Sequence, residues 1–335
     1  MTQREIVRSY LRQDKYRSTP NLTLAKKIYN DGKNSKIFTT VEVVRTTIRQ
    51  LKGKAGVLKG FDLRKDVSEF GGKPDGVRNP FPKIPKARKH FKKWGLLKVK
   101  TKKCLILSDV HIPYHDPEAL ALACEYGVDE GVDTVILNGD FADHFSCSFW
   151  EKDPRERDFP KERKLVMEGL AYIRGMFPKQ RIIYKIGNHE ERYLRYMTVK
   201  APELLGIEAF RFENLYNLAH FDMELVGDKR PILVNEYVVI HGHEFYGTGG
   251  NLNPARGYYL KTKSPTISAH LHRISEHIEK DVQGNYIKSY SSGCLCEMHP
   301  DYAPLNGWSL GFVVITKGKK QSKVRNLTIE NGEIC

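Results

Sequence analysis

Five short apolar runs in the second part of the chain each end in side chains that bind metal ions well. The runs are CLILSD (104–109), TVILNGD (134–140), RIIYKIGN (181–188), EYVVIHGH (236–243) and TISAHLH (266–272). Helical stretches separate the early runs, and strands that alternate with helices are typical of an α/β domain. Because functional groups in such sheets collect at the carboxyl ends of the strands, we expect the five ends to converge on one crevice.

The pattern of expected strands, helices and charges divides the chain into parts. After residue 275 the pattern changes to hairpins, in 275–293 and again in 311–332, so the domain finishes as antiparallel β-structure. We predict three parts: a small helical domain at 1–55, a basic linker containing Pro and Gly at 56–102, and the α/β domain at 103–335.

Several features of the composition bear on location. No run of about 18 apolar residues occurs, and the charged N-terminus lacks the apolar core of a secretory signal, so we expect no membrane segment. The six cysteines show no disulfide-like spacing, which favours a reducing, cytoplasmic location. Cys294 and Cys296, one residue apart, are interpreted as strand residues on one face.

The net charge of +15 is unevenly distributed. Residues 1–103 hold 28 Lys and Arg against 8 Asp and Glu, whereas residues 104–335 hold 27 against 32. This asymmetry suggests that a polyanion-binding appendage is attached to a slightly acidic body, and nucleic acid is the partner that we expect.

The first part of the chain reads as short helices. One covers 22–30, and another starts near a capping box formed by Thr39 and Glu42 and ends at Gly53. Cations recur along one face of the second helix, at Arg45, Arg49 and Lys52. The arrangement resembles a DNA-binding helix-turn-helix. A helical cap with a solvated charged face is the alternative.

The linker ends in a dense basic segment, KARKHFKKW (86–94). Its cations include Lys89, Lys92 and Lys93, and the aromatic residues Phe91 and Trp94 lie among them. Such a segment could follow a phosphate backbone and stack on bases, or it could be a solvated tether. The density of charge favours nucleic-acid binding.

The motifs at the five run ends resemble, in order, those of the calcineurin-like metallophosphoesterases. The family pattern D-x-H, G-D-x-x-D, G-N-H-[DE], H-G and G-H-x-H corresponds to 109–111, 139–143, 187–190, 241–242 and 269–272. The one departure is Ala269, where glycine is usual. The resemblance covers roughly 103–320 and implies a four-layer αββα sandwich.

The resemblance also implies two divalent transition-metal ions bridged by Asp140. One ion is expected at Asp109, His111 and His272, and the other at Asn188, His241 and His270. Mixed imidazole and oxygen ligands favour manganese, with iron, zinc or cobalt as alternatives. Such a pair polarises the phosphoryl oxygens and lowers the pKa of a bridging water, so that the resulting hydroxide attacks in line.

The remaining site residues follow from the same motifs. We expect His189 to protonate the leaving group and Asp143 to orient it. Gly187 is expected to permit a sharp turn. Two further groups complete the prediction: supporting side chains behind the ligands, Glu190 and His243, and arginines that bind substrate phosphate unless they form surface salt bridges, Arg192 and Arg256.

The substrate is less constrained than the chemistry. Phosphoprotein phosphatases of this family carry Arg-Gly after the last Asp of the second motif, but here Asp143 is followed by His144 and Phe145. The basic front part instead favours a nuclease or phosphodiesterase acting on nucleic acid. The alternatives are a phosphatase for proteins or small phosphoesters, and an inactive nucleic-acid-binding scaffold.

Overall fold

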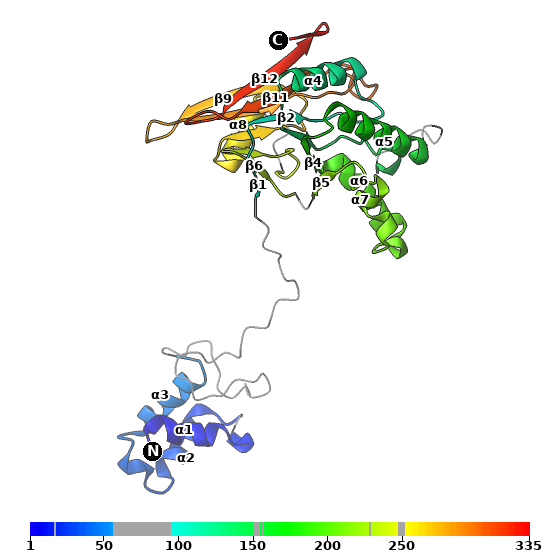
Figure 1. The fold of residues 1–335 in the computed structure, drawn as a ribbon. Coiled ribbons are helices and arrows are strands. Elements are labelled where there is room, and N and C mark those ends of the chain that lie inside the picture. Colours follow the sequence, from blue (N-terminus) through cyan, green and yellow to red (C-terminus); the bar gives the residue numbers. More distant parts are fainter. Residues whose placement is uncertain (17, 56–94, 150–154, 156, 228, 247–251) are drawn as a thin grey trace. The chain divides into compact units, whose positions relative to one another are not determined.

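The structure of this chain is a computed structural model that describes residues 1–16, 18–55, 95–149, 155, 157–227, 229–246 and 252–335. Its contacts divide the chain into two compact units, Met1–Lys92 and Lys93–Cys335 (Figure 1). We describe each unit separately. The predicted linker role of residues 56–94 falls outside the described residues and stays a prediction.

In residues 1–16 and 18–55, the N-terminal unit contains three α-helices and two short 3-10 turns. The helices are α1 (Gln3–Leu11), α2 (Asn21–Asn30) and α3 (Val41–Leu51), and the turns are η1 (Asp14–Tyr16) and η2 (Asn34–Lys36). Each α-helix turns its apolar side to a shared core whose centre is fully buried, at Val7, Leu24, Ile28, Val44 and Ile48. The helical character predicted for this segment is therefore confirmed.

The two ends of α3 can be compared with the caps predicted from the sequence. The N-cap is Thr40, whose hydroxyl accepts from the Val43 N–H, so the predicted capping box of Thr39 and Glu42 is wrong by one residue. Glu42 pairs with Arg45 instead, at 3.3 Å. Gly53 does end the helix. Its φ of 67° lets its N–H and the next one bond back to carbonyls of the last turn.

The second unit is built on two β-sheets. The seven-stranded sheet has the order β13 (Glu333–Ile334), β12 (Lys323–Glu330), β11 (Gly311–Thr316), β2 (Lys103–Leu107), β3 (Thr134–Asn138), β4 (Arg181–Lys185), β5 (Met223–Val226). The six-stranded sheet has the order β1 (Leu97–Val99), β6 (Ile232–Val234), β7 (Tyr237–Val239), β8 (Thr266–Ser268), β10 (Tyr286–Ser292), β9 (Ile274–Lys280). Because β1 pairs with β6, the predicted start of this domain at residue 103 is too late.

The directions of the strands agree with the α/β part and the hairpins predicted from the sequence. From β2 to β5, neighbouring strands of the larger sheet run parallel. The pairs β9–β10 and β11–β12 are antiparallel, which confirms the predicted hairpins. Two crossover helices connect the parallel strands: α4 (Pro117–Asp129) follows β2, and α5 (Phe159–Met176) follows β3. Each helix has Asp as its N-cap and Pro in its first turn.

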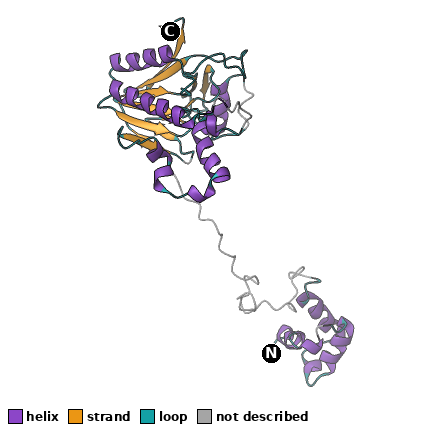
Figure 2. Cartoon of the chain, turned by 90° about the vertical axis from the view of Figure 1, so that its right-hand side faces the viewer, coloured by secondary structure: helices purple, strands orange, loops and turns teal. Residues whose placement is uncertain are grey.

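Side-chain alternation in the strands produces the layers. In β2, Leu105 and Leu107 pack with α4 and α5, whereas Cys104 and Ile106 face the core between the sheets. On the outer side of the six-stranded sheet, α8 (Pro254–Thr262) packs against β8, β9 and β10. The four-layer αββα sandwich is therefore confirmed (Figure 2).

The described residues of this unit contain further helices. They are α6 (Asn188–Lys200) and the short η5 (Phe145–Cys147), η7 (Pro202–Leu204), η8 (Glu208–Phe210) and α7 (Phe212–Leu215). Across the described parts of the chain, no helix is both long and apolar enough to cross a membrane.

Candidate metal centre

The donors predicted from the motifs all follow strand ends, and these strands come from both sheets. Asp109, Asp140 and Asn188 follow the neighbouring parallel strands β2, β3 and β4. His241 follows β7, and His270 follows its parallel neighbour β8. The two sheets thus supply oxygen and imidazole ligands to one place at their edges.

The backbone at these positions is unusual. Five of the seven predicted ligands have a positive φ, from 53° to 70°, and none of them is glycine: Asp109, His111, Asp140, His270 and His272. Only a few per cent of residues other than glycine adopt this region, although Asn, Asp and His do so more often than the rest. Such strained residues persist only where the surrounding structure fixes them, and they cluster at functional sites.

The first half of the centre surrounds Asp109. His111 Nε2 and His272 Nε2 lie 3.1 Å apart, and His272 Nε2 lies 3.3 Å from Asp109 Oδ1. Two ligands at right angles around a cation, each about 2.1 Å from it, lie about 3.0 Å apart. The three side chains are therefore spaced as the ligands of one ion would be.

The second half surrounds His241. Its Nε2 lies 3.1 Å from Asn188 Oδ1 and 3.2 Å from Asp140 Oδ2. His270 completes a group with Asp140 and His241 whose donor atoms all lie within 4.8 Å of one another. Asp140 Oδ2 is also 3.9 Å from His111 Nε2, so its carboxylate lies between the two halves.

Two observations test whether a cation fits. Asp109 Oδ1 is buried and finds no hydrogen-bond partner among the described residues, a costly state for a carboxylate oxygen unless a cation binds it. His241 is fully buried, and burial lowers its pKa, but the carboxylates of Asp140 and Asp109 raise that pKa to about 10. The donors therefore form an electron-rich site that attracts positive charge.

Residues 102–302 match the family model described as Calcineurin-like phosphoesterase. The chain belongs to this family. It is a metal-dependent phosphoesterase, a hydrolase that acts on phosphoric esters. The expected motifs and fold thus agree with the family match, while the identity of the metal stays a proposal.

Curated relatives of this phosphoesterase include two phage proteins, each named "Gene 54 protein". The one from Mycobacterium phage L5 is 26% identical over 180 residues, which are 52% of this chain and 70% of the relative. The one from Mycobacterium phage D29 is 27% identical over 148 residues, 43% of this chain and 57% of the relative.

Solved structures with a similar fold are more distant in sequence. Vps29 from Entamoeba histolytica, complexed with zinc, is 11% identical with a TM-score of 0.38, over 70% of this chain and 96% of that one. The phosphoesterase YfcE from E. coli is 15% identical with a TM-score of 0.34, over 67% and 98%.

Beside the phosphoesterase donors, three predicted residues form a chain of contacts. Asp143 Oδ2 lies 3.0 Å from His189 Nδ1 and also 3.0 Å from His111 Nδ1. Arg192 donates from Nη2 to His189 Nε2 at 2.8 Å and from Nη1 to Asp143 Oδ1 at 3.2 Å. Asp143 is thus placed to orient both histidines, and Arg192 covers the nitrogen of His189 that faces Asp140.

The two predicted substrate arginines differ in position. Arg192 lies at the centre, one helical turn after His189 on α6. Arg256 is exposed on α8, where its backbone N–H bonds the N-cap Asn253. Over the described residues, no contact links Arg256 to the seven donors, so its predicted role stays a prediction.

Glu190, which we expected to be a supporting side chain, holds the loop of the predicted bridging ligand Asp140. Its two carboxylate oxygens accept five hydrogen bonds, from the backbone N–H groups of Asp140, Phe141, Ala142 and Gly187 and from the hydroxyl of Tyr184. One buried side chain thus fixes the loop that carries Asp140 to the strand end that carries Asn188.

Gly187 has a different reason for being glycine than the predicted turn. Its φ of −101° and ψ of −172° are open to any residue. A Cβ at this position would lie 2.2 Å from Asp140 Oδ1, however. The glycine is needed for close approach of the two strand ends, and the prediction of a sharp turn is wrong.

A buried ion pair supports His241. The Lys185 ammonium lies 2.8 Å from Glu244 Oε1, and both side chains are almost completely buried. Glu244 accepts from the backbone N–H groups of His241 and Gly242. Burial raises the pKa of Glu244, but Lys185 and the nearby histidines lower it to about 2. His243 lies behind the centre and contacts Glu191 at 3.3 Å.

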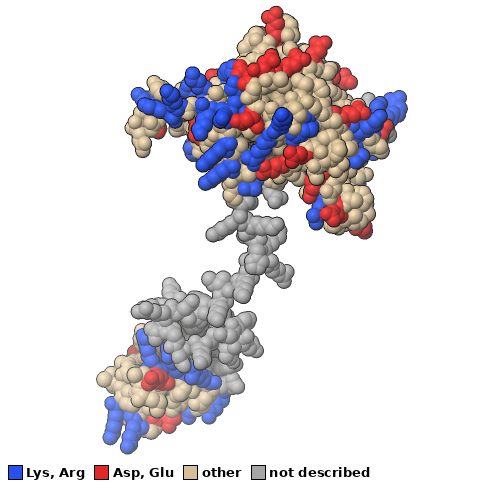
Figure 3. Space-filling view, viewed as in Figure 1, with Lys and Arg blue, Asp and Glu red and all other residues tan. Residues whose placement is uncertain are grey.

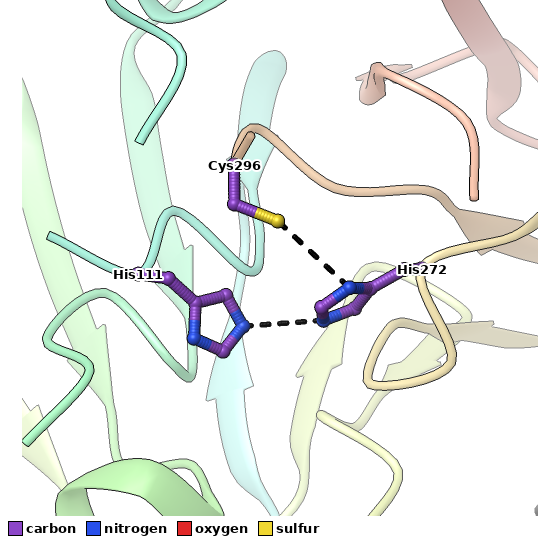
Figure 4. A group of neighbouring side chains, drawn as sticks. All are labelled: His111, His272 and Cys296. Carbon is purple, nitrogen blue, oxygen red and sulfur yellow. Dashed lines mark hydrogen bonds between the residues drawn. The ribbon is translucent and has the colours of Figure 1, made fainter. Parts of the chain in front are cut away.

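Sequence reasoning missed one side chain at the centre. Cys296 Sγ lies 3.8 Å from His272 Nδ1, and these residues form a metal-competent group with His111 (Figure 4). Cys294 and Cys296 lie beyond the end of β10, in isolated bridges, so their interpretation as strand residues is wrong. The C-x-C pattern at 294–296 was the available signal.

The predicted nucleic-acid contacts are partly described. Arg49 is exposed on α3, and Arg45 is partly exposed beside Glu42. Lys52 is only 5% exposed, and its ammonium donates to Asn21 Oδ1 at 2.8 Å, so it does not join this basic face. Lys89, Lys92 and Lys93 lie outside the described residues.

Proposed function

We propose that this phosphoesterase hydrolyses phosphodiester bonds in nucleic acid, using two divalent transition-metal ions of which manganese fits best. The observation that supports the reaction is the convergence of the seven donors around Asp140. Imidazole and oxygen ligands together suit manganese, iron, zinc or cobalt. Bound ions of this kind polarise a phosphoryl group and make water acidic enough to supply a nucleophile near neutral pH.

The residues beside the ions would protonate the leaving group and bind the phosphoryl oxygens. Burial lowers the pKa of His189, but the carboxylates of Asp140 and Asp143 raise it above its ordinary value. Nε2 accepts from Arg192 in this structure, so His189 would donate a proton from Nε2 to the departing oxygen after Arg192 has moved and Nε2 has taken up that proton. Arg192, which bonds that nitrogen, can move its charged hydrogen bonds to a phosphoryl oxygen when substrate enters.

The choice of nucleic acid rests on the N-terminal unit. Residues 1–55 hold 13 Lys and Arg against 4 Asp and Glu. Most of these cations are exposed: Arg4, Arg12, Lys15, Lys26, Lys27, Lys33, Lys36, Arg49 and Lys54. Figure 3 shows Lys and Arg side chains on the visible face of this unit. A polyanion with regularly spaced phosphates is the partner that such a surface attracts most strongly.

A phosphoprotein substrate has less support. The residue after Asp143 is His144, which is buried and bonds the Tyr216 hydroxyl at 2.6 Å and the His189 carbonyl at 3.0 Å. It therefore cannot take the place of an arginine that reaches substrate phosphate.

The deciding experiment compares a diester with a monoester. We expect the full chain with Mn²⁺ to hydrolyse bis-p-nitrophenyl phosphate and to cut single-stranded DNA. Turnover of p-nitrophenyl phosphate alone would favour a phosphatase instead. Metal binding measured by elemental analysis without any turnover would favour the inactive scaffold.

A substitution tests the role of His189. Because His189 is not counted among the metal ligands, His189→Asn should lower kcat about 100-fold or more while metal content stays the same. His220→Asn, at an exposed histidine of the same unit, is the control. Unchanged kcat in His189→Asn would show that another group protonates the leaving oxygen.

A further inference from the structure

The loop at 297–309 leads from Cys296 to the strand region of β11 and is held in a compact shape. Asn306 Nδ2 donates to the carbonyls of Met298 at 2.6 Å and Ala303 at 2.8 Å. Asn306 Oδ1 accepts from the Trp308 N–H at 2.9 Å. One amide side chain thus fixes the loop from both sides, and the aromatic residues that it carries have defined positions.

Trp308 lies directly against the metal centre. Its ring packs edge-on to His272, with 4.3 Å between the ring centroids. The Ser309 N–H donates to the His272 carbonyl at 2.8 Å, which locks the end of the loop to this predicted ligand. The indole is partly exposed. It therefore forms a wall beside the place where a phosphoryl group would bind.

Tyr302 extends this wall outward. Its ring centroid is 6.3 Å from that of Trp308, and 80% of the residue is exposed. Tyr302 therefore lies beside Trp308, while Trp308 packs directly against the predicted ligand His272. An aromatic side chain this exposed contributes little to folding, and its face is open to a planar ligand.

The charge of the loop indicates which part of a substrate it would touch. Glu297 and Asp301 are exposed on the same loop and would repel phosphates. A nucleobase carries no charge and stacks on aromatic faces with a gain of about 1–3 kcal/mol per base. The loop is thus better suited to bases than to the backbone of a strand.

We propose that Trp308 and Tyr302 form a stacking subsite for one unpaired nucleobase next to the phosphoryl group that is cleaved. The proposal rests on the proposed function and narrows it, because a base can enter such a subsite only when it has left the duplex stack. The enzyme would then prefer single-stranded or unpaired nucleic acid to duplex.

Two diesters with the same leaving group test the subsite in the full chain with Mn²⁺. Thymidine 5′-(p-nitrophenyl phosphate) carries a base, and methyl p-nitrophenyl phosphate does not. We expect a higher kcat/KM for the thymidine ester. Tyr302→Ala should reduce that value about 10-fold or more and leave the methyl ester nearly unchanged, whereas Tyr302→Phe should retain most of it. Because Trp308 also packs on His272, Trp308→Ala should lower the ratio of the two kcat/KM values, and Trp308→Phe should retain most of that ratio.

Binding without turnover gives a second measurement. In the His189→Asn background, oligo(dT) should quench tryptophan fluorescence, and the quench should shrink when Trp308→Phe is added. An oligomer with abasic sugars at every position should quench less than oligo(dT).

The outcomes separate the two proposals. Equal kcat/KM for the two diesters, or equal losses on both in Tyr302→Ala, would overturn the subsite and leave diester hydrolysis standing. Hydrolysis of p-nitrophenyl phosphate but of neither diester would overturn the proposed function, and the subsite with it.

Discussion

At the scale of single residues, the centre depends on side chains that never touch the metal ions. Five predicted ligands hold left-handed backbone conformations, which cost about 1–3 kcal/mol each when surrounding structure does not enforce them. Glu190 provides part of that enforcement with its five hydrogen bonds around the Asp140 loop. Loss of such a support should therefore appear as loss of metal before it appears as unfolding.

Glu190→Gln tests this support directly. An amide cannot accept on both ends, so the N–H groups of Asp140 or Phe141 would lose their partner, and metal affinity should fall about 10–100-fold. Isothermal titration with Mn²⁺ would measure the change. Glu191→Gln, which alters a partly exposed neighbour on α6, is the control. Equal affinities for both variants would contradict the role of Glu190.

Gly187→Ala tests the close approach of two strand ends. The added methyl group would lie 2.2 Å from Asp140 Oδ1, so the carboxylate must move and metal binding should be lost. The control is Gly175→Ala on α5, where a Cβ meets nothing within 4 Å and the change should stabilise the helix by up to about 1 kcal/mol. Metal content and melting temperature together would distinguish the two sites.

At the scale of elements, the sequence predicted the strands and their ligand-bearing ends because alternation and motif spacing are local properties. The exact helix start at Thr40 was missed by one residue, since adjacent threonines offer equivalent caps. Glu190 was recognised as a support, but three of its five partners lie about 50 positions away in the chain and only the fold brings them to it. Cys296 was missed for the same reason, because its partner His272 is distant in sequence.

An ion-pair cluster joins three elements of the α/β unit. Glu130, which follows α4, accepts from Arg325 on β12 at 2.8 Å and from Lys103 on β2 at 2.6 Å. These hydrogen bonds lower the pKa of Glu130 to about 2. The folded state therefore holds a carboxylate that is harder to protonate than in the unfolded chain.

This difference predicts how stability changes with pH. The contribution of Glu130 to the free energy of unfolding is complete above its unfolded pKa of about 4.5, and it is lost as the pH falls toward 2. Because the pair is partly exposed, we expect Glu130→Gln to cost only about 1 kcal/mol at pH 6, with less cost at pH 3. Urea unfolding at both pH values would measure it. Glu125→Gln, at an exposed position on α4, should show no such trend.

At the scale of the whole molecule, a basic three-helix unit accompanies a metal-dependent hydrolase domain on one chain. The helices and their charge were predictable from composition and periodicity, but which cations are exposed was not. Lys52 shows this, because helical spacing placed it with Arg45 and Arg49 while packing buries it against α2.

Removal of exposed cations tests the proposed partner. The triple variant Lys26→Ala, Lys27→Ala and Arg49→Ala should bind single-stranded DNA more weakly. The slope of log K against log salt should fall by up to about 2, at roughly 0.7 per lost phosphate contact on a single strand. Lys319→Ala, Lys320→Ala and Lys323→Ala, three exposed positions of the other unit, form the matched control. Equal slopes for the two triple variants would argue against DNA binding by the N-terminal unit.

The division of the donors between two sheets has a mechanical consequence. Hydrogen bonds connect strands within each sheet, whereas apolar packing and a few side-chain bonds, such as those from Asn326 on β12 to the carbonyls of Ser275 and Ser291, join one sheet to the other. Ions held by Asp109 and Asn188 from one sheet and by His241 and His270 from the other would cross-link the two sheets at this edge. The amount of bound metal would then affect how strongly the sheets resist separation, in addition to whether the reaction proceeds.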